Sequence, residues 1–286
     1  MTLPAGLSLG PMRRDEADIL IGWAADEGWN PGKADIDIAW QTDPEAFIAL
    51  RKGDELAGGG TIFAYGKAYG FMGLFIMRRD LRSEGLGEQL WHYRLKRLRD
   101  RLAPDASIGM DGVFAMVPFY ERGGFVFSHN DVRYEGIAKG TMDPAARRLE
   151  PAMFETIDRF DRAFVPAPRP AFLRRWMFQP GAYAIGLFVS DQLTGYGAAR
   201  PARTGFKIGP VFAEHADIAE RLIASLFACI AGEQVQLDVP EPNAAGVRLA
   251  ERFGLKQFFG CACLYNGPNP NLPVDKIFGV TSFEFG

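Results

Sequence analysis

An arginine followed by two closely spaced glycines, Arg82-x-x-Gly85-x-Gly87, forms the segment best suited to binding an anion. Glycine lets the backbone approach a ligand closely. The segment follows an apolar run at 69–77 and precedes a run of helical periodicity, so its N–H groups are expected at a helix N-terminus, where phosphate binds well. It has neither a Gly-Lys-Ser/Thr ending nor a Rossmann fingerprint, which excludes the common nucleotide loops. We expect this loop to hold a pyrophosphate.

A second motif, Tyr120-Glu-Arg-Gly-Gly-Phe125, lies where a short helical turn is expected to end and lead into a strand. With the glycine loop before it, the motif resembles the GCN5-related N-acetyltransferase (GNAT) family. That family has Arg/Gln-x-x-Gly-x-Gly/Ala after its fourth strand and Tyr-Glu-Lys/Arg-x-Gly-Phe at the end of its fourth helix. One departure is Val113, which stands where the family often has an asparagine seven residues before the tyrosine.

The resemblance implies a site for acetyl-CoA, with the pantetheine arm against the strand end and the pyrophosphate in the loop. It implies that the following residues contact the cofactor: Phe75, Ile76, Met77, Arg82, Ser83, Glu84, Gly85, Leu86 and Gly87. It also implies that Tyr120 is the general acid that protonates the departing thiolate, because a phenol within hydrogen-bond reach of sulfur can donate as charge develops.

Acceptor-side residues are expected in the turn-rich segment 27–32 and at the end of the strand that contains Asp111. Acetyl transfer to an amine needs a proton acceptor, and Asp111 and Glu27 are the two candidates, with a water relay as the alternative to both. Trp29 and Asn30 either bound the acceptor pocket or hold this loop in place. Because no cysteine is expected near the site, the sequence predicts direct attack in a ternary complex.

These motifs are expected on an ordered series of helices and strands. Asp15 is expected to cap a helix that ends at Gly28, and three antiparallel strands follow between residues 47 and 77. The helix after the glycine loop carries four apolar residues on one face: Trp91, Leu95, Leu98 and Leu102. Further elements are expected as a strand at 107–111, a helical turn at 119–122 and a strand at 125–129.

The second half repeats the order of these elements. Its prolines at 166, 168 and 170 are expected to break the chain, and Asn243 is expected to cap its last helix. Ala250 stands at the position of the tyrosine, and Glu214 and Asp217 stand where the glycine loop would be. Because these acids would repel a pyrophosphate, this copy is not expected to bind CoA in the same way.

The predicted fold class is therefore α/β (α+β), with two tandem GNAT domains, each a mixed and mostly antiparallel sheet flanked by helices. The chain resembles a tandem bacterial subgroup whose C-terminal domain is degenerate. The first domain is expected at residues 1–138, a linker at 139–152 and the second domain at 153–286.

Composition and charge limit the classes of partner. The net charge of −3 provides no overall field for nucleic acid or an anionic membrane. The basic run at 94–101 is expected to be a solvated helix face without the aromatic residues that nucleic-acid binding needs. Scattered histidines and three cysteines predict no metal site. The sequence shows neither a signal peptide at residues 1–12 nor a membrane span, so a cytoplasmic protein is expected.

The predicted function is transfer of the acetyl group of acetyl-CoA to the primary amine of a small molecule. The protein is expected to be a monomer, as an internal pseudo-dimer, or a homodimer. One alternative is a CoA-binding sensor or scaffold, and another is a transferase of a longer acyl or aminoacyl group. The bulk of Phe75 and Met77 favours a short acyl group.

Overall fold

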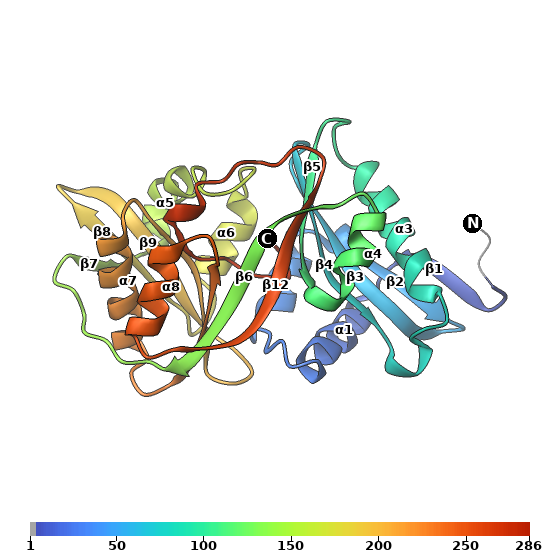
Figure 1. The fold of residues 1–286 in the computed structure, drawn as a ribbon, viewed down its shortest axis with the longest axis horizontal. Helices are drawn as coiled ribbons and strands as arrows, with labels where there is room; N and C mark the ends of the chain where they lie inside the picture. Colours follow the sequence, from blue (N-terminus) through green and yellow to red (C-terminus); the bar gives the residue numbers. More distant parts are fainter. Residues whose placement is uncertain (1–3) are drawn as a thin grey trace.

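A mixed β-sheet runs through both halves of the chain (Figure 1). The computed structural model describes residues 4–286, so the first three residues of the segment searched for a signal peptide lie outside it. The first half contributes the strands β1 (Leu7–Pro11), β2 (Phe47–Lys52), β3 (Glu55–Tyr65), β4 (Tyr69–Met77), β5 (Ser107–Val113) and β6 (Val126–Ile137). Its helices are α1 (Arg14–Asp26), α2 (Asp35–Thr42), α3 (Leu86–Arg99) and α4 (Val117–Arg122). The three expected antiparallel strands are confirmed as β2, β3 and β4.

The second half repeats this arrangement, which confirms the predicted class of two tandem domains of α/β type. Its strands are β7 (Ala146–Arg148), β8 (Tyr183–Val189), β9 (Gln192–Pro201), β10 (Phe206–Ala213), β11 (Gln234–Pro240), β12 (Lys256–Asn266) and β13 (Ile277–Gly279). Its helices are α5 (Phe154–Asp161), α6 (Pro170–Met177), α7 (Ala216–Cys229) and α8 (Ala244–Arg252). Asn243 caps α8 as expected, since its Oδ1 accepts a hydrogen bond of 2.9 Å from the N–H of Gly246.

The two halves exchange one long strand each at the centre of the sheet. The strand order is β1-β2-β3-β4-β5-β12-β6-β11-β10-β9-β8-β7, so five strands of each half are followed by one strand from the other half. β12 pairs with β5, β6 pairs with β11, and the two exchanged strands lie side by side between the lobes in Figure 1. Strands on opposite sides of the expected linker at 139–152 therefore pair with each other. The domain ranges 1–138 and 153–286 stay a prediction.

The parallel strands β4 and β5 separate after a short paired segment. Residues 69–71 pair with residues 107–109, and the register of the described residues contains no β4–β5 pair beyond them. β4 is then irregular, because Leu74 has a φ of 48° and the pairing with β3 shifts register opposite this point. Backbone N–H and C=O groups on this edge of β4 are thereby available to a ligand.

The corresponding gap in the second copy is filled by the chain itself. β10 and β11 pair at residues 206–208 and 235–237 before they separate. β13 then pairs with β10 at Val211 and Phe212, and the N–H of Val280 donates to the carbonyl oxygen of Asp238 on β11 at 2.8 Å. A backbone segment thus occupies the second copy where the first copy keeps an opening.

Several local expectations differ from the structure. Arg13, not Asp15, is the N-cap of α1, and its N–H donates to Glu16 at 2.7 Å. α2 and α6 were not expected, although Pro170 occupies the first turn of α6, where its missing N–H leaves no helix hydrogen bond unmade. β6 continues to Ile137, well beyond the expected end at 129, because it crosses into the second half.

Arg94 corrects the expectation of a solvated basic face at 94–101. Its side chain is fully buried, and Nη2 donates to the carbonyl oxygens of Thr61 and Gly73 at 2.7 and 2.6 Å. Lys96 and Arg97 are exposed as expected. Within residues 4–286, no helix has both the length and the apolar character that crossing a membrane requires.

Helices cover the two faces of the first half of the sheet differently. Ala262 and Leu264 of β12 pack with α3 and α4 on one face, and Cys263 and Tyr265 pack with α1 and α2 on the other. This alternation follows from the two-residue period of a strand. Tyr120 belongs to the first face and Trp29, in the loop after α1, packs on the second, and both line the cavity where β4 and β5 separate.

Candidate active site

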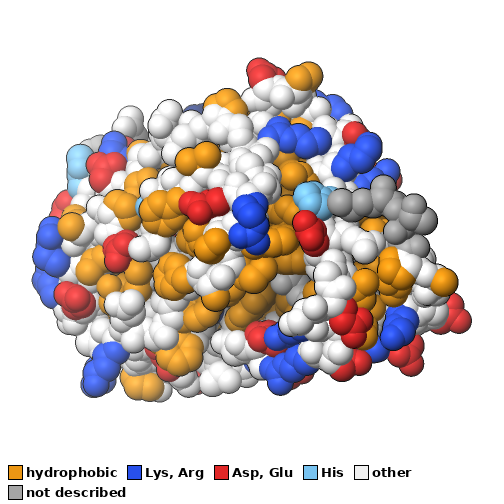
Figure 2. Space-filling model, turned by 45° about the vertical axis from the view of Figure 1, so that its right-hand side comes forward, with side chains coloured by type: hydrophobic (Ala, Val, Ile, Leu, Met, Phe, Trp, Pro, Cys, Tyr) orange, Lys and Arg blue, Asp and Glu red, His pale blue; other side chains and the backbone are white. Residues whose placement is uncertain are grey.

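A cavity of about 270 Å³ opens where β4 and β5 separate. Its walls include eight residues predicted from the sequence: Glu27, Trp29, Phe75, Ile76, Met77, Arg82, Asp111 and Tyr120. A neighbouring cavity of about 310 Å³ shares Glu27, Met77 and Arg82 and adds Arg78 and Arg79. The face of the molecule in Figure 2 has a hollow in its middle where hydrophobic side chains gather. One opening therefore brings together the expected cofactor side and acceptor side, while the role of each residue stays a prediction.

The glycine loop has the backbone conformation of an anion site. Ser83 and Gly85 have φ values of 69° and 76°, a region that glycine adopts at little cost. Gly85 is the N-cap of α3 and offers no side-chain cap, so the first N–H groups of the helix point outward without a capping partner. A Cβ added at Gly87 would lie 3.5 Å from Met77 and Phe75, so alanine would also fit there.

Glu27 is paired with the arginines of the cofactor side. Arg82 Nη2 donates to Glu27 Oε1 at 2.8 Å, and Arg79 Nε donates to the same oxygen at 3.1 Å. Arg82 also donates through Nε to the carbonyl oxygen of Met77 at 3.0 Å. The hydrogen bond from Arg82, opposed by partial burial and reinforced by Arg79, lowers the pKa of Glu27. An ionised and paired carboxylate of lowered pKa is a weak proton acceptor.

Tyr120 lies in α4, packs against Gly112 of β5 and is buried. Its ring packs 5.1 Å from the ring of Trp91, and Gly112 of β5 leaves room for it on the other side. Burial raises the pKa of the phenol, against the attraction of Arg94, so Tyr120 keeps its proton and can act as a donor.

Asp111 faces a row of titratable groups on the exchanged strands. It stands opposite Cys263 on β12, which in turn stands opposite His129 on β6. Burial and then the nearby Asp131 raise the pKa of Asp111 well above its usual range. Asp131 is itself buried, and burial together with Asp238 raises its pKa to about 8. Its Oδ1 has no hydrogen-bond partner among residues 4–286.

His129, Asp131 and Cys263 offer donor atoms that lie within 4.8 Å of one another beside Asp111. The sequence predicts no metal site, and that stays a prediction. The spacing of these residues along the chain could not indicate the cluster, because it forms only when β12 inserts next to β6.

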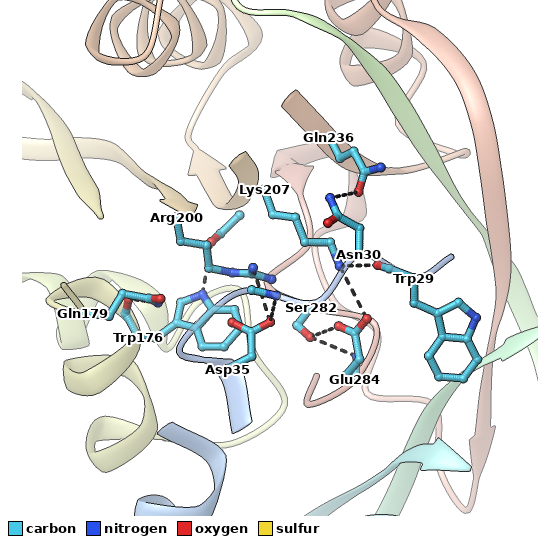
Figure 3. A network of polar contacts seen from close by, with 12 residues as sticks. Trp29, Asn30, Asp35, Trp176, Gln179, Arg200, Lys207, Gln236, Ser282 and Glu284 are labelled. Atoms are coloured by element: carbon cyan, nitrogen blue, oxygen red, sulfur yellow. Dashed lines mark hydrogen bonds and ion pairs between the residues drawn. The ribbon is translucent and has the colours of Figure 1, made fainter. Parts of the chain in front are cut away.

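Trp29 and Asn30 have different positions. Asn30 holds the loop to the second half, because Nδ2 donates to the carbonyl oxygen of Thr204 at 3.0 Å and Oδ1 accepts from the Thr204 N–H at 2.9 Å. Figure 3 shows Asn30 directed toward Gln236, to which it also donates at 3.2 Å. The indole of Trp29 lines the cavity, and its carbonyl oxygen accepts from Arg133 at 2.9 Å. Of the two, only Trp29 is among the lining residues.

Phe259 and Cys261 of β12 also line the cavity and were not expected from the sequence. The expectation that no cysteine lies near the site is wrong, because strand exchange carries Cys261 from the second half into the first. Burial, followed by the influence of Asp111, raises the pKa of this thiol well above its usual range. It therefore remains a thiol, whereas a nucleophilic cysteine needs a thiolate. No local motif marks either residue.

Both halves of the chain match family models with the description Acetyltransferase (GNAT) domain, one over residues 36–144 and the other over residues 157–279. The chain is also similar to holothin acyltransferase of Pseudoalteromonas sp. (strain SANK 73390). The two are 24% identical over 279 residues, which cover 96% of this chain and 93% of the relative.

Solved structures share the fold. A putative acetyltransferase from Pyrococcus horikoshii superposes with a TM-score of 0.86 at 20% identity, over 100% of this chain and 98% of that one. A tandem GNAT protein from the clavulanic acid biosynthesis pathway superposes with a TM-score of 0.63 at 13% identity, over 92% of this chain and 99% of that one. These likenesses extend the match from single domains to the tandem arrangement.

Proposed function

The chain belongs to the GNAT superfamily as a protein with two such domains in tandem, and from that premise we propose that its first copy transfers an acetyl group from acetyl-CoA to the primary amine of a small molecule. The observation that carries this proposal is the cavity lined by Arg82 at the start of the glycine loop, by the open edge of β4 and by Tyr120. Because β13 fills the corresponding gap of the second copy, we assign the transfer to the first copy alone.

The residues present fit the groups of a CoA thioester. The outward N–H groups at the start of α3 suit a pyrophosphate, and Arg78, Arg79 and Arg82 add positive charge beside them. The unpaired edge of β4 at residues 75–77 suits the amides of a pantetheine arm, which can pair with it as a neighbouring strand would. Tyr120 would then lie near the sulfur.

The proposed reaction is a direct attack of the amine nitrogen on the thioester carbonyl. The nitrogen–carbon bond forms and the carbon–sulfur bond breaks, while a backbone N–H near Met77 stabilises the charge on the carbonyl oxygen. Asp111, in its ionised form, takes the proton that the nitrogen loses, and Tyr120 gives a proton to the departing thiolate. Proton exchange with solvent restores both groups. Glu27, which is paired with Arg82, has the role of orienting that arginine.

An acyl-cysteine intermediate is not part of this proposal. Cys261 lies in the cavity, but burial keeps its sulfur protonated. A covalent route would need a base to activate that thiol, and Asp111 already has the task of deprotonating the amine. The relative from Pseudoalteromonas sp. is named for acyl transfer to holothin, so holothin belongs among the acceptors to be screened.

The test is calorimetric titration of acetyl-CoA into the protein and into a Gly85→Glu variant. The new carboxylate would stand at the N-terminus of α3 and repel a pyrophosphate. Gly66→Glu is a matched control, because Gly66 is also an exposed turn glycine with a positive φ, 65° against 76°, and open space around its Cα. We expect saturable binding that Gly85→Glu abolishes and Gly66→Glu retains.

Equal binding by all three proteins, or binding by none, would refute the proposed cofactor site. Release of free thiol on addition of an amine separates an enzyme from a CoA-binding sensor or scaffold. Replacing acetyl-CoA with CoA thioesters of longer acids in the same assay tests whether the acyl group is only acetyl.

A further inference from the structure

The acceptor end of the cavity is defined here as the part lined by Trp29, Met110, Asp111, Phe259 and Cys261. Four of these five side chains are aromatic or contain sulfur. Phe259 and Cys261 come from the exchanged strand β12, and Trp29 comes from the loop that the second half holds in place. Aromatic rings and methionine sulfur favour contact with the flat face of a conjugated ring.

The charged groups behind the acceptor end compensate one another. Arg133 donates to Asp238 through two hydrogen bonds of 2.6 and 2.8 Å. The remaining charges form two ion pairs of 3.4 Å, Lys207 with Glu284 and Arg200 with Asp35. Figure 3 shows these two pairs side by side, with the indole of Trp29 directed away from them. Asp238, Glu284 and Asp35 are thus each paired with a cationic side chain of the protein.

Two further acids adjoin the cavity, and their environment favours the neutral form. Burial and then Asp131 raise the pKa of Asp111, and burial and then Asp238 raise the pKa of Asp131. The two acids share a second cavity with Tyr69, Cys263, His129 and Arg169. Arg133, two residues from Asp131 on β6, is paired with Asp238, and Arg169 is paired with Asp161. Glu27 on the opposite wall is committed to Arg82 and Arg79. While Asp111 is protonated, the acceptor end therefore offers an ammonium group no charged partner, and Asp111 serves as a base only in the ionised fraction that grows with pH.

Resting on the proposed acyl transfer, we infer that the acceptor is a planar, weakly basic amine of the arylamine type, which enters the cavity uncharged. Burying an ammonium without a partner carboxylate is strongly unfavourable, whereas an amine attached to a conjugated ring carries no charge at neutral pH. Its ring would lie against Trp29 and Phe259, and its nitrogen would point toward Asp111 and the thioester. The proton balance of the transfer is unchanged.

Three amines of similar size separate basicity from shape. Aniline is planar and weakly basic, benzylamine has a planar ring but a strongly basic nitrogen, and cyclohexylamine is strongly basic and not planar. An alkylamine with a pKa near that of lysine, about 10.4, is neutral in only roughly one molecule in a few thousand at pH 7. We expect kcat/KM for aniline to exceed that for the other two by at least ~100-fold at pH 7. The benzylamine value should rise about tenfold per pH unit relative to that of aniline.

Variants of Trp29 test the contact with the ring. Trp29→Phe keeps an aromatic wall and should retain the preference for aniline, whereas Trp29→Ala should lower kcat/KM for aniline at least ~10-fold. Both should leave the affinity for acetyl-CoA unchanged, because the backbone carbonyl that Arg133 and Lys207 contact is retained. Equal losses in the two variants would contradict a stacking contact.

A benzylamine or cyclohexylamine rate equal to or above that of aniline at pH 7 would overturn the inference while acyl transfer itself stood. Acetyl-CoA binding with no transfer to any of the three amines would also overturn it. Failure to bind acetyl-CoA would instead refute the proposed function on which the inference rests.

Discussion

Replacing Gly112 with alanine should displace the phenol of Tyr120 while leaving the cofactor loop intact. A Cβ at this position would lie 2.3 Å from Cε2 of Tyr120, whereas ordinary contacts begin at 3.4 Å, so the ring has to move by ~1 Å. β5 cannot move away easily, because Gly112 pairs with Ala262 of β12, and Trp91 limits the ring on its other side. A catalytic group misplaced by this amount can lose about 100-fold in rate. The crowding should cost ~1–3 kcal/mol of stability.

The assay is thiol release from acetyl-CoA in the presence of an amine, with acetyl-CoA affinity measured separately by calorimetry. We expect Gly112→Ala to lower kcat about 100-fold with an unchanged Kd. Gly22→Ala is the matched control, since a Cβ at Gly22 meets nothing within 4 Å and lies in α1. It should keep full activity and gain up to ~1 kcal/mol of stability. A folded Gly112→Ala protein with a kcat within twofold of the control would refute the role of Tyr120.

Three further substitutions address ionisation. Because burial and Asp131 raise the pKa of Asp111, we expect kcat of the unmodified protein to rise with pH. Asp111→Asn should lower kcat by ~10²–10⁴-fold and remove this rise. A rise that persists in the variant would exclude Asp111 as the base. For Asp131, the pKa of about 8 means that the folded protein keeps a proton that the unfolded chain loses, so stability falls between about pH 4 and pH 8. Asp131→Asn should remove that fall in urea unfolding measured across this range, and parallel curves would count against it. For Glu284, the effect of burial is outweighed by Lys207 and Arg133, which lower the pKa to about 2. Ionised Glu284 therefore stabilises the folded protein above about pH 4.5, and this contribution is lost as the pH falls toward 2. Glu284→Gln should lower the unfolding free energy at pH 7 by ~3–5 kcal/mol, because Lys207 loses its partner, and should flatten the acid limb of the same curve.

The sequence alone determined the features that depend on neighbouring residues. The glycine loop, the helix that follows it and the strand before it could be predicted because loop conformation and helix periodicity are set locally. The same holds for Tyr120 at a helix end and for Asn243 as a cap. The order of elements in the two halves was also sufficient to predict the tandem fold.

Local patterns gave incomplete information about the acceptor side. Glu27, Trp29 and Asp111 could be predicted to lie near the cavity, but the sequence does not show that Glu27 pairs with Arg82 or that Asp111 adjoins Asp131. Only the pairing with Arg82 in the folded chain distinguishes Glu27 from Asp111 as the weaker proton acceptor. Ionisation depends on burial and on nearby charges, and both are properties of the folded chain.

The contribution of both halves to the acceptor end follows from strand pairing in the folded chain and could not be read from the sequence. The alternating pattern of β12 indicates which side chains share a face, but it does not indicate the strands with which β12 pairs. Its insertion between β5 and β6 brings Phe259 and Cys261 into the cavity of the first half. β13 similarly closes the gap of the second copy, although nothing in its three residues predicts that place. Strand pairing joins backbones that are remote in sequence, and the backbone groups that pair are the same in every residue except proline.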